Sequence, residues 1–524
     1  MKKIFALILA LLMLLPLVVA CGDDDETESS SSSSESTMSE SSSTPNNGDS
    51  QSSSSSEPTD SRYPDKPKWS SKDTVLDSWN GKQLNVLATR YGDTAGAPWA
   101  QMELAPSAFG ETINKAFTDR QAKIQELYGV TVNWIEAMAN QTVSGDITTA
   151  LTSKDATYEI AIPRAHEVQS LVSLVYDMSG SDISFLKQDY FSDAAYEAFT
   201  IYEHTLFAAG DFDFSDEQVS YMLFYNKDMA NTLGIPDLYT EVKNGTWTYD
   251  MLKNLSKNVS GDDGNGVQGD EDTYGFATKN VTRFYQYAGI LEADVDPDTG
   301  AYRVALGLDQ TKVSAVVANI IECVKGTNWA RQGQDSSGVN GWGGSWGANA
   351  TTAFVEGRVL FLDEVAQQFD NIASIKFSLG VLPFPKLNAE QDDYYVPTTK
   401  EQTTFICVPK CTADKEMSFY FIDVLSWTGQ EFVMEAYYEK LAERLDMKTK
   451  DADMEILKDY IFDNKVYDIG FLSSGWAGFL QDVKSGSYAN GTDNFAQLFQ
   501  EASEQAELTV QSWNEAWLYY YEEE

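Results

Sequence analysis

Apolar and polar positions between residues 83 and 162 alternate in two different periods. Short apolar runs predict strands at 83–89, 130–135 and 158–162. Between the first two runs, apolar residues recur at helical spacing over 113–127, and Gly129 stands where a helix would end. Residues 147–151 predict a second helix. A strand–helix–strand order of this kind is typical of an α/β domain with a largely parallel sheet.

The later part of the chain continues with mixed elements. A β-prone run at 218–225 leads into a helix opening at 226–230, and Thr246 or Thr248 is the expected N-cap of the next helix. A turn-rich Asp/Gly stretch follows at 261–275, and helices dominate from Lys415 onward. Further elements are predicted as a helix at 313–324, a helix and strand at 352–357 and 358–362, and strands at 379–383 and 403–408.

The first twenty residues have the pattern of a secretory signal. Lys2 and Lys3 precede the nearly continuous apolar run 4–20, which is marginal in length for a membrane span. The run ends at Ala20-Cys21-Gly22, and a small residue followed by Cys and Gly resembles the bacterial lipobox, in which the Cys is lipidated. The alternative is an uncleaved anchor with a chance Cys. We expect a signal peptide at 1–20 and a lipid on Cys21.

Residues 22–61 are dominated by Ser and acidic side chains. Such a segment cannot bury enough apolar surface to offset the entropy of ordering, so we expect it to be disordered. We interpret residues 21–70 as a lipidated Cys and a flexible tether.

Charge and cysteine content exclude several classes of function. The net charge is −43, from 37 basic and 80 acidic residues, so nucleic acid and anionic lipid head groups are disfavoured partners. After Cys21, the chain has Cys323, Cys407 and Cys411. A disulfide between Cys407 and Cys411 and buried free thiols are both open. Only two histidines occur, so a zinc site is not expected.

No enzyme motif stands out. The sequence has no Gly-x-Ser-x-Gly, P-loop or His-Glu-x-x-His motif, and among 80 acidic residues paired carboxylates arise by chance. We therefore do not expect an enzyme, and no cofactor is implied.

The Asp/Gly stretch offers a weak calcium candidate. With Gly266 at the sixth position of an EF-hand loop, Asp263, Asn265 and Asp272 occupy ligand positions. The first position is then Gly261, which has no side-chain oxygen. We favour an Asx- and Gly-rich turn over a metal site.

Four segments, in this order, resemble the extracellular solute-binding proteins of ABC importers, the family that includes maltose- and oligosaccharide-binding proteins. They are an apolar strand ending in Tyr-Asn-Lys-Asp, a helix–Gly–strand element, a strand that crosses between lobes, and a late segment of the longer members; here they occupy 221–228, 353–359, 377–385 and 460–468. The resemblance covers about residues 80 to 520.

The resemblance implies an α/β fold with two lobes, hinge-crossing strands, and a cleft that closes on its ligand. We expect one lobe to comprise 74–210 and 382–429, and the other 211–381 and 430–524. The implied protein is a monomer, held on the extracellular face of the membrane by its lipid, that captures a small solute and delivers it to a membrane permease. We expect a carbohydrate ligand, such as an oligosaccharide. A peptide or polyamine ligand, or a sensor role, is the alternative.

Family clefts hold sugars with aromatic rings and polar side chains, and ligands of open α/β sheets bind beyond the carboxyl ends of strands. Candidates were chosen because they follow predicted strands, lie at the first lobe crossing, or are tryptophans in Gly-rich context. They are Arg90, Tyr91, Arg164, His166, Asp211, Asp213, Trp342, Trp346, Asp363, Glu364 and Trp476.

Overall fold

The structure is a computed structural model of the 524-residue chain. It divides into two compact units, residues 1–60 and 61–524, and all described residues lie in the second. The described residues are 79–89, 102–104, 109–138, 142–179, 186–259, 261–267, 269, 271–278, 281–305, 307–324, 328–332, 348–399, 402–445, 448–472 and 495–521. The predicted signal peptide, Cys21 and the tether lie outside them. None of the described helices combines the length and the apolar character needed to cross a bilayer.

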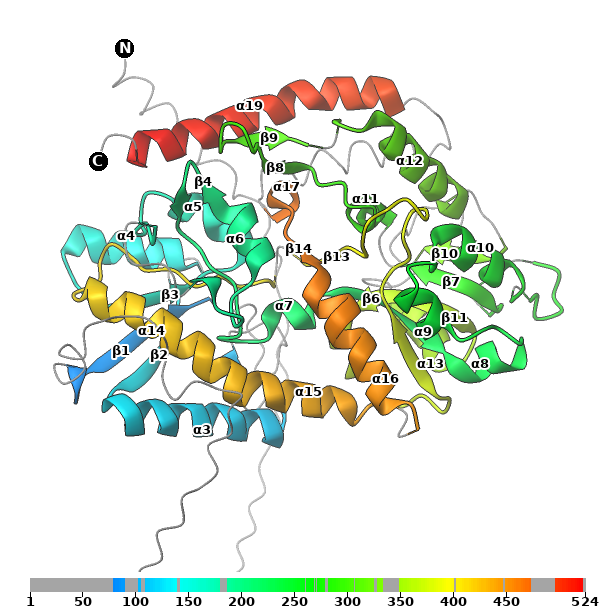
Figure 1. The fold of residues 1–524 in the computed structure, drawn as a ribbon, viewed down its shortest axis with the longest axis horizontal. Helices are drawn as coiled ribbons and strands as arrows, with labels where there is room; N and C mark the ends of the chain where they lie inside the picture. The colour runs from blue at the N-terminus through cyan, green and yellow to red at the C-terminus, as the bar shows by residue number, and fades with distance from the viewer. Residues whose placement is uncertain are drawn as a thin grey trace, which may run out of the picture. The chain divides into compact units, whose positions relative to one another are not determined.

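The first sheet has three parallel strands in the order β2-β1-β3 (Figure 1). They are β1 (Gln83–Ala88), β2 (Thr131–Glu136) and β3 (Ile160–Ile162). The intervening helices are α3 (Glu111–Tyr128) and α4 (Val143–Ser153). Helix α3 ends at Gly129, whose φ of 64° is a left-handed conformation that favours glycine. The predicted strand–helix–strand order and the parallel pairing are confirmed.

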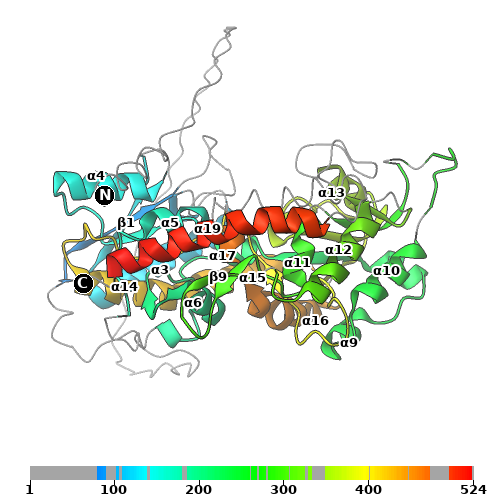
Figure 2. The ribbon, with the colours of Figure 1, turned by 90° about the horizontal axis from the view of Figure 1, so that it is seen from above.

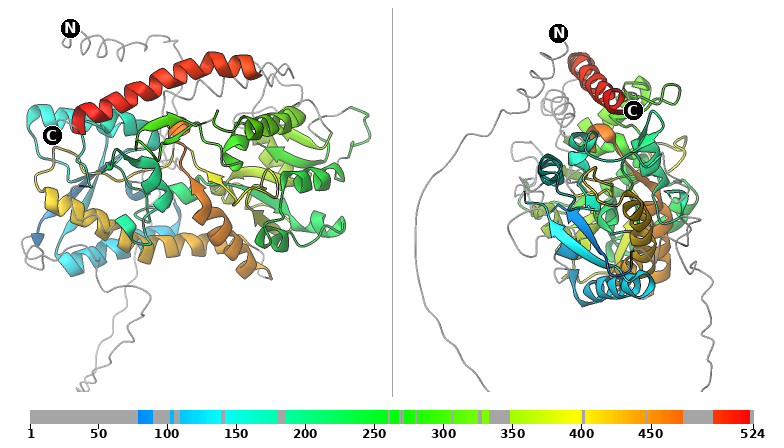
Figure 3. Two further views of the ribbon diagram at one scale, coloured as in Figure 1. Left: turned by 45° about the horizontal axis from the view of Figure 1, so that its top comes forward. Right: turned by 90° about the vertical axis from the view of Figure 1, so that its left-hand side faces the viewer.

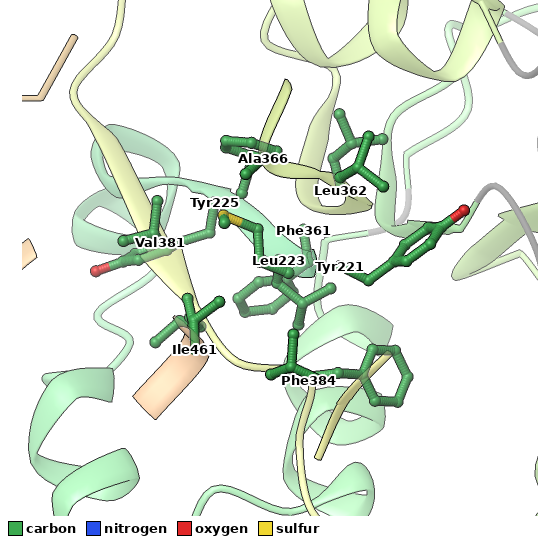
Figure 4. Close-up of a cluster of buried hydrophobic side chains, with 14 of the residues drawn as sticks. Tyr221, Leu223, Tyr225, Phe361, Leu362, Ala366, Val381, Phe384 and Ile461 are labelled. Atoms are coloured by element: carbon green, nitrogen blue, oxygen red, sulfur yellow. The ribbon is translucent and has the colours of Figure 1, made fainter. Parts of the chain in front are cut away.

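The second sheet is mixed, with the strand order β10-β7-β11-β6-β12. Strands β7, β10 and β11 are parallel, whereas β6 is antiparallel to both β11 and β12. Side chains of β6 (Tyr221, Leu223, Tyr225) lie among those of β11 and β12 in Figure 4. The bounds are β6 (Tyr221–Asn226), β7 (Tyr274–Thr278), β10 (Ala330–Gln332), β11 (Val359–Val365) and β12 (Leu379–Leu382).

Two segments connect the sheets: a first linking segment, 206–220, and a second linking segment, 383–408. The predicted strand at 403–408 is not a regular strand. It forms isolated bridges, Thr404 with Arg164, Ile406 with Ala208, and Cys407 with Ala161. The second linking segment thus runs beside β3 after it leaves the second sheet, and the first linking segment lies beside the second. A continuous helical path, 415–442, also crosses between the cores.

The remaining elements are short, apart from α12, α14 and α19. The helices are α5 (Val168–Leu171), α6 (Asp193–Phe199), α7 (Ser215–Gln218), α8 (Lys227–Thr232), α9 (Leu238–Lys243), α10 (Tyr249–Lys257), α11 (Phe284–Tyr287), α12 (Gln310–Val324), α13 (Ala348–Val355), α14 (Lys415–Thr428), α15 (Glu435–Ala442), α16 (Lys450–Glu455), α17 (Ile469–Leu472) and α19 (Phe495–Tyr521). π-Helices η8 (Gly429–Met434) and η9 (Ile456–Ile461) continue α14 and α16. The 3₁₀ turns are η1 (Met102–Leu104), η3 (Ala165–Glu167), η5 (Val281–Arg283), η7 (Ala366–Phe369) and η10 (Phe462–Asn464). The short strands are β4 (Thr200–Ile201), β5 (His204–Thr205), β8 (Ala293–Val295), β9 (Tyr302–Val304), β13 (Val396–Pro397) and β14 (Lys465–Val466).

The apolar side chains form separate cores. One cluster surrounds the second sheet and includes Phe224 and Trp247. Two clusters surround the first sheet, and one of them takes in α14. The C-terminal helix α19 lies along β9 (Figures 2 and 3), where Trp513 and Trp517 pack on Tyr302 at ring distances of 6.0 and 6.4 Å. Burial of these rings stabilises the packing of α19 against the hydrophobic cluster that contains Leu87 of β1.

Local details decide two choices that the sequence leaves open. Thr248 is the N-cap of α10 by position, but its side chain makes no capping hydrogen bond. Thr246 is not the cap, because its hydroxyl bonds to Glu241. Cys407 and Cys411 are buried and not joined by a disulfide, and Cys323 is also a buried free thiol. Of the two alternatives for Cys407 and Cys411, the structure therefore has free thiols.

Candidate ligand-binding site

Polar side chains gather where the strands of the first sheet end. Thr89 follows β1, and Glu167 lies in η3 just after β3. The Thr89 hydroxyl donates to Glu167 Oε1 at 2.8 Å, and the Val143 amide donates to Glu167 Oε2 at 2.9 Å. Arg164 Nε lies 3.8 Å from Glu167 Oε1. Burial raises the pKa of Glu167, while the Thr89 hydrogen bond opposes that change.

The corresponding ends of the second sheet carry Asp363, Thr278 and Tyr287. Asp363 pairs directly with Thr278 across β11 and β7. Its carboxyl accepts hydrogen bonds from the Thr278 hydroxyl at 2.7 Å and the Tyr287 hydroxyl at 2.6 Å. Burial raises the pKa of Asp363 to about 7, against the effect of these two donors. The group can therefore hold a proton near neutral pH.

The linking segments carry a third polar cluster between these two. Thr404 donates to Asp213 Oδ2 at 2.9 Å, and Ser215 Oγ lies 2.6 Å from Thr404 Oγ1. Because Thr404 also pairs with Arg164 through the backbone, Arg164 and Asp213 are brought to the same place. Burial raises the pKa of Asp213 to about 6.

The second linking segment is also held to the second sheet. Arg283 donates to the Thr398 carbonyl at 2.9 Å, and its guanidinium carbon lies 4.6 Å from the centre of the Tyr221 ring. Thr398 therefore contacts Arg283, which follows β7, and Thr404 pairs with Arg164, which follows β3. We call the polar residues at the strand ends and on this segment the strand-end band: Thr89, Arg164, Glu167, Asp213, Thr278, Arg283, Tyr287, Gln332, Asp363, Thr398, Thr403 and Thr404.

Three buried oxygens of the strand-end band receive no hydrogen bond from any residue that the structure describes. They are Gln332 Oε1, Thr398 Oγ1 and Thr403 Oγ1, in side chains that are 3%, 2% and 0% exposed. A buried polar atom without a partner costs about 1–3 kcal/mol. Oxygens of this kind are suited to donors that arrive with a polar ligand.

Several predicted site residues lie differently from the prediction. Asp363 and Glu364 do not follow a strand that ends at residue 362, because β11 extends to Val365. Glu364 points to the opposite side of the strand from Asp363, as alternation requires, and accepts from the Val365 amide at 3.1 Å. His166 is half-buried in η3. Asp211 is half-buried and lines a separate pocket, described below. Arg90, Tyr91, Trp342, Trp346 and Trp476 lie outside the described residues.

Thr278, Tyr287, Gln332 and Thr404 escaped the sequence analysis. Thr278 and Gln332 end β7 and β10, two strands that the pattern did not predict. The usable signal was the apolar run 274–277 immediately before Thr278, which follows the Asp/Gly stretch. Nothing local marks Thr404, because its partners Arg164 and Asp213 are distant in sequence.

The calcium candidate folds as a tight loop whose side chains accept backbone hydrogen bonds. Asp272 accepts from the amides of Asp263 and Gly269 at 2.9 and 2.8 Å. Asp263 accepts from the Asn265 amide at 2.9 Å, and Asn265 from the Val267 amide at 2.6 Å. Asp262, Asp263 and Asp272 place oxygens within 4.8 Å of one another. The bonds to Asp263 and Asn265 are those of consecutive Asx turns, whereas Asp272 accepts from two residues that precede it and so closes the loop.

Comparison with known proteins identifies the family. The family model for bacterial extracellular solute-binding proteins matches residues 119–445. No curated protein matches the chain. A cyclo/maltodextrin-binding protein in complex with maltotetraose has 12% identity and a TM-score of 0.53, covering 82% of this chain and 97% of that chain. Mycobacterium tuberculosis UspC has 12% identity and a TM-score of 0.52, covering 81% of this chain and 99% of that chain.

A likeness at this identity shows the fold, which in these proteins is a two-lobed α/β arrangement. The two sheets, the linking segments and the helical path between their cores fit that arrangement. With the family model matching most of its length, the chain belongs to the bacterial extracellular solute-binding protein family and has a two-lobed, periplasmic-binding-protein-like fold.

Proposed function

We propose that this protein captures a carbohydrate, most suitably an oligosaccharide, and delivers it to an ABC importer. The observation that carries the proposal is the strand-end band. Of the residues that carry its three unpaired oxygens, Gln332 pairs with Thr278, Thr398 accepts from Arg283 through its carbonyl, and Thr403 accepts from the Ala165 amide. These residues belong to a band at the strand ends, where ligands of α/β folds bind. Sugar hydroxyls both donate and accept, so they can satisfy such a mixed set.

The aromatic part of the proposed site comes from the tryptophans. Trp342 and Trp346 lie in the segment 333–347 that follows β10 and Gln332 in the sequence, and each has a glycine neighbour. Large rings in Gly-rich segments lack regular neighbours to pack against, which favours a role as stacking platforms for a sugar ring. Arg90, Tyr91, Trp476 and His166 complete the proposed set, and the structurally similar protein bound to maltotetraose supports the ligand class.

We further propose that Cys21 carries a lipid and that residues 22–61 tether the folded body. The support is the small residue–Cys–Gly motif after an apolar signal and the Ser-rich, acidic composition that follows. Metabolic labelling with a fatty acid tests the anchor. Wild type should be labelled and membrane-bound, and Cys21→Ala should be unlabelled and released or unprocessed. Membrane association without label in both forms contradicts the anchor.

Calorimetric titration of a chain that begins at Gly22, without the signal and Cys21, tests the ligand class. Maltotetraose and other linear oligosaccharides should bind with one site, whereas amino acids and peptides should not. Trp342→Ala and Trp346→Ala should each weaken binding by about tenfold to a hundredfold, the effect of losing about 1–3 kcal/mol of ring contact. Unchanged affinity in both variants, together with a lowered melting temperature, would make the tryptophans core residues. Binding of peptides in place of sugars would favour the alternative solute class.

A further inference from the structure

A pocket of about 690 Å³ lies away from the strand-end band. It is bordered by the segment before α6, by α7, by α15 and by the η9–β14 region, which Figure 1 shows close together in the middle of the fold. Asp211, Asp216 and Glu217 of the first linking segment line it, whereas Asp213 between them faces Thr404. No member of the strand-end band lines this pocket.

The pocket lies between the cores of the two lobes. Tyr190 and Phe191 on one wall belong to the same cluster as Val86 of β1. Phe462 and Met434 on another wall belong to the cluster that contains Phe224 of β6. A ligand held here would therefore contact both halves of the molecule.

Acidic groups outnumber basic groups in this pocket, and both of its lysines already have partners. Lys465 forms an ion pair with Asp216 at 3.0 Å and a second with Glu217. Lys458 places its ammonium 4.1 Å from the ring centre of Tyr438. The other acidic side chains in the wall include Asp189, Asp193, Glu435 and Asp463. The wall is thus short of positive charge.

A buried, unpaired oxygen points to a missing ligand. Glu217 is 4% exposed and lines the pocket, and no described residue other than the neighbouring acid Asp216 is in hydrogen-bonding contact with its carboxyl beyond Lys465, so Oε2 receives no donor. Its other oxygen is occupied by Lys465. Burial, reinforced by Asp216, raises the pKa of Glu217, and burial raises the pKa of nearby Asp211 to about 7. A cation bound beside these carboxyls would lower both pKa values and favour the charged forms.

We propose that this pocket binds an extended aliphatic di- or polyamine. Separated ammonium groups match carboxylates spread over several elements, and the methylene chain matches the rings of Tyr190, Phe191 and Phe462. A single metal ion fits less well, because the described residues place three carboxylates close enough to share an ion only at Asp262, Asp263 and Asp272. The Lys458–Tyr438 contact shows that a ring in this wall already accepts an ammonium group.

Calorimetric titration with spermidine tests the proposal on a chain that begins at Gly22, without the signal and Cys21. One site per chain is expected, with no binding of an uncharged diol of similar length. Glu217→Gln removes the buried carboxylate, and Asp463→Asn removes an exposed one that should not affect folding. Each should weaken spermidine binding at least tenfold. Glu390→Gln makes the same charge change at an exposed position outside the pocket and should leave binding intact.

Three outcomes would overturn the proposal. The first is the absence of spermidine binding. The second is binding at many weak sites, with an affinity that Glu390→Gln lowers as much as the pocket variants do. The third is direct competition between spermidine and the sugar. The last would place the amine in the strand-end band. Sugar affinity measured on Asp463→Asn should equal that of the parent chain. If neither the parent chain nor any variant bound sugar, the proposed function would be contradicted, and the conclusion about amine binding in this pocket would still stand on the spermidine titration.

Discussion

The Thr404 hydroxyl donates a hydrogen bond to Asp213 Oδ2 at 2.9 Å, joining two residues 191 positions apart. Both are buried, and each lies on one of the two linking segments. Ser215 completes the cluster. Its hydroxyl contacts Thr404, and its backbone amide donates a hydrogen bond to Asp213 Oδ1 at 2.8 Å. The relative course of the two segments therefore depends on a small polar cluster, in addition to apolar packing.

Replacing Thr404 with Val should destabilise the protein by about 1–3 kcal/mol, because Asp213 and Ser215 lose a partner in a buried setting. Urea unfolding followed by tryptophan fluorescence measures the change. Thr311→Val makes the same replacement at an exposed position of α12 and should change stability by no more than about 0.5 kcal/mol. Equal stability of the two variants would mean that the hydroxyl contributes nothing to the link.

Asp363 should make stability depend on pH. Burial raises its pKa to about 7 in the folded protein, while an unfolded Asp titrates near about 3.9. The folded state then binds more protons between these values, so this group lowers stability as pH rises from about 4 to about 7. Asp363→Asn cannot titrate. The melting temperature of wild type should therefore fall relative to that of Asp363→Asn as pH rises from 5 to 8. Melting temperatures that change with pH in parallel for the two proteins would contradict the raised pKa.

The sequence predicts most of the first lobe because its signals are local. Apolar runs mark β1 and β2, and the apolar spacing with Gly129 marks α3 and its end. Strands β7 and β10 are missed because β7 adjoins the Asp/Gly stretch and β10 has only three residues, too few to show a period. The segment 403–408 has strand-like composition, yet it makes only isolated bridges because it crosses between the lobes.

The site was harder to predict, because its geometry depends on contacts between distant residues. Position after a strand identifies Arg164, and the resemblance identifies Asp213, but their meeting at Thr404 requires the linking segments to run side by side. Asp363 was chosen as a loop residue and is instead a strand residue, because β11 is longer than its apolar run. Charge alone did not distinguish Asp211 from Asp213, although they face different surroundings.

Gly429 should not tolerate a side chain. It begins the π-helix after α14, with an ordinary helical φ of −64°, so the constraint is space alone. A Cβ there would lie 1.8 Å from the Asp211 carbonyl oxygen. Gly429→Ala should cost about 1–3 kcal/mol through displacement of the helix from the first linking segment. Gly261→Ala is the matched control, since its Cβ would meet nothing closer than 3.9 Å. Similar unfolding midpoints would contradict this close approach.

The Asp/Gly loop should not bind calcium tightly. Gly261 supplies no side-chain oxygen at the first ligand position, and Asp263, Asn265 and Asp272 already accept backbone hydrogen bonds. Melting temperatures with excess EDTA and with millimolar calcium should agree within about one or two degrees, since a ligand stabilises the folded protein appreciably only when its concentration exceeds its dissociation constant. A rise of several degrees with calcium that Asp272→Asn abolishes would establish a calcium site.

Gln332 should separate stability from ligand binding. Its Oε1 is buried at the end of β10 without a donor from the described chain, and it immediately precedes the segment that carries Trp342 and Trp346. Gln332→Met keeps a similar length and flexibility but removes the buried oxygen. Unliganded protein should therefore be as stable as wild type or up to about 1–3 kcal/mol more stable, because the cost of the unpaired atom is lost. Binding of the oligosaccharide should weaken about tenfold, because one hydrogen bond is worth about 1–1.5 kcal/mol. Urea unfolding without ligand and calorimetric titration with ligand measure the two effects on the same sample. Lower stability with unchanged affinity would show that Gln332 supports the sheet and that the ligand binds elsewhere.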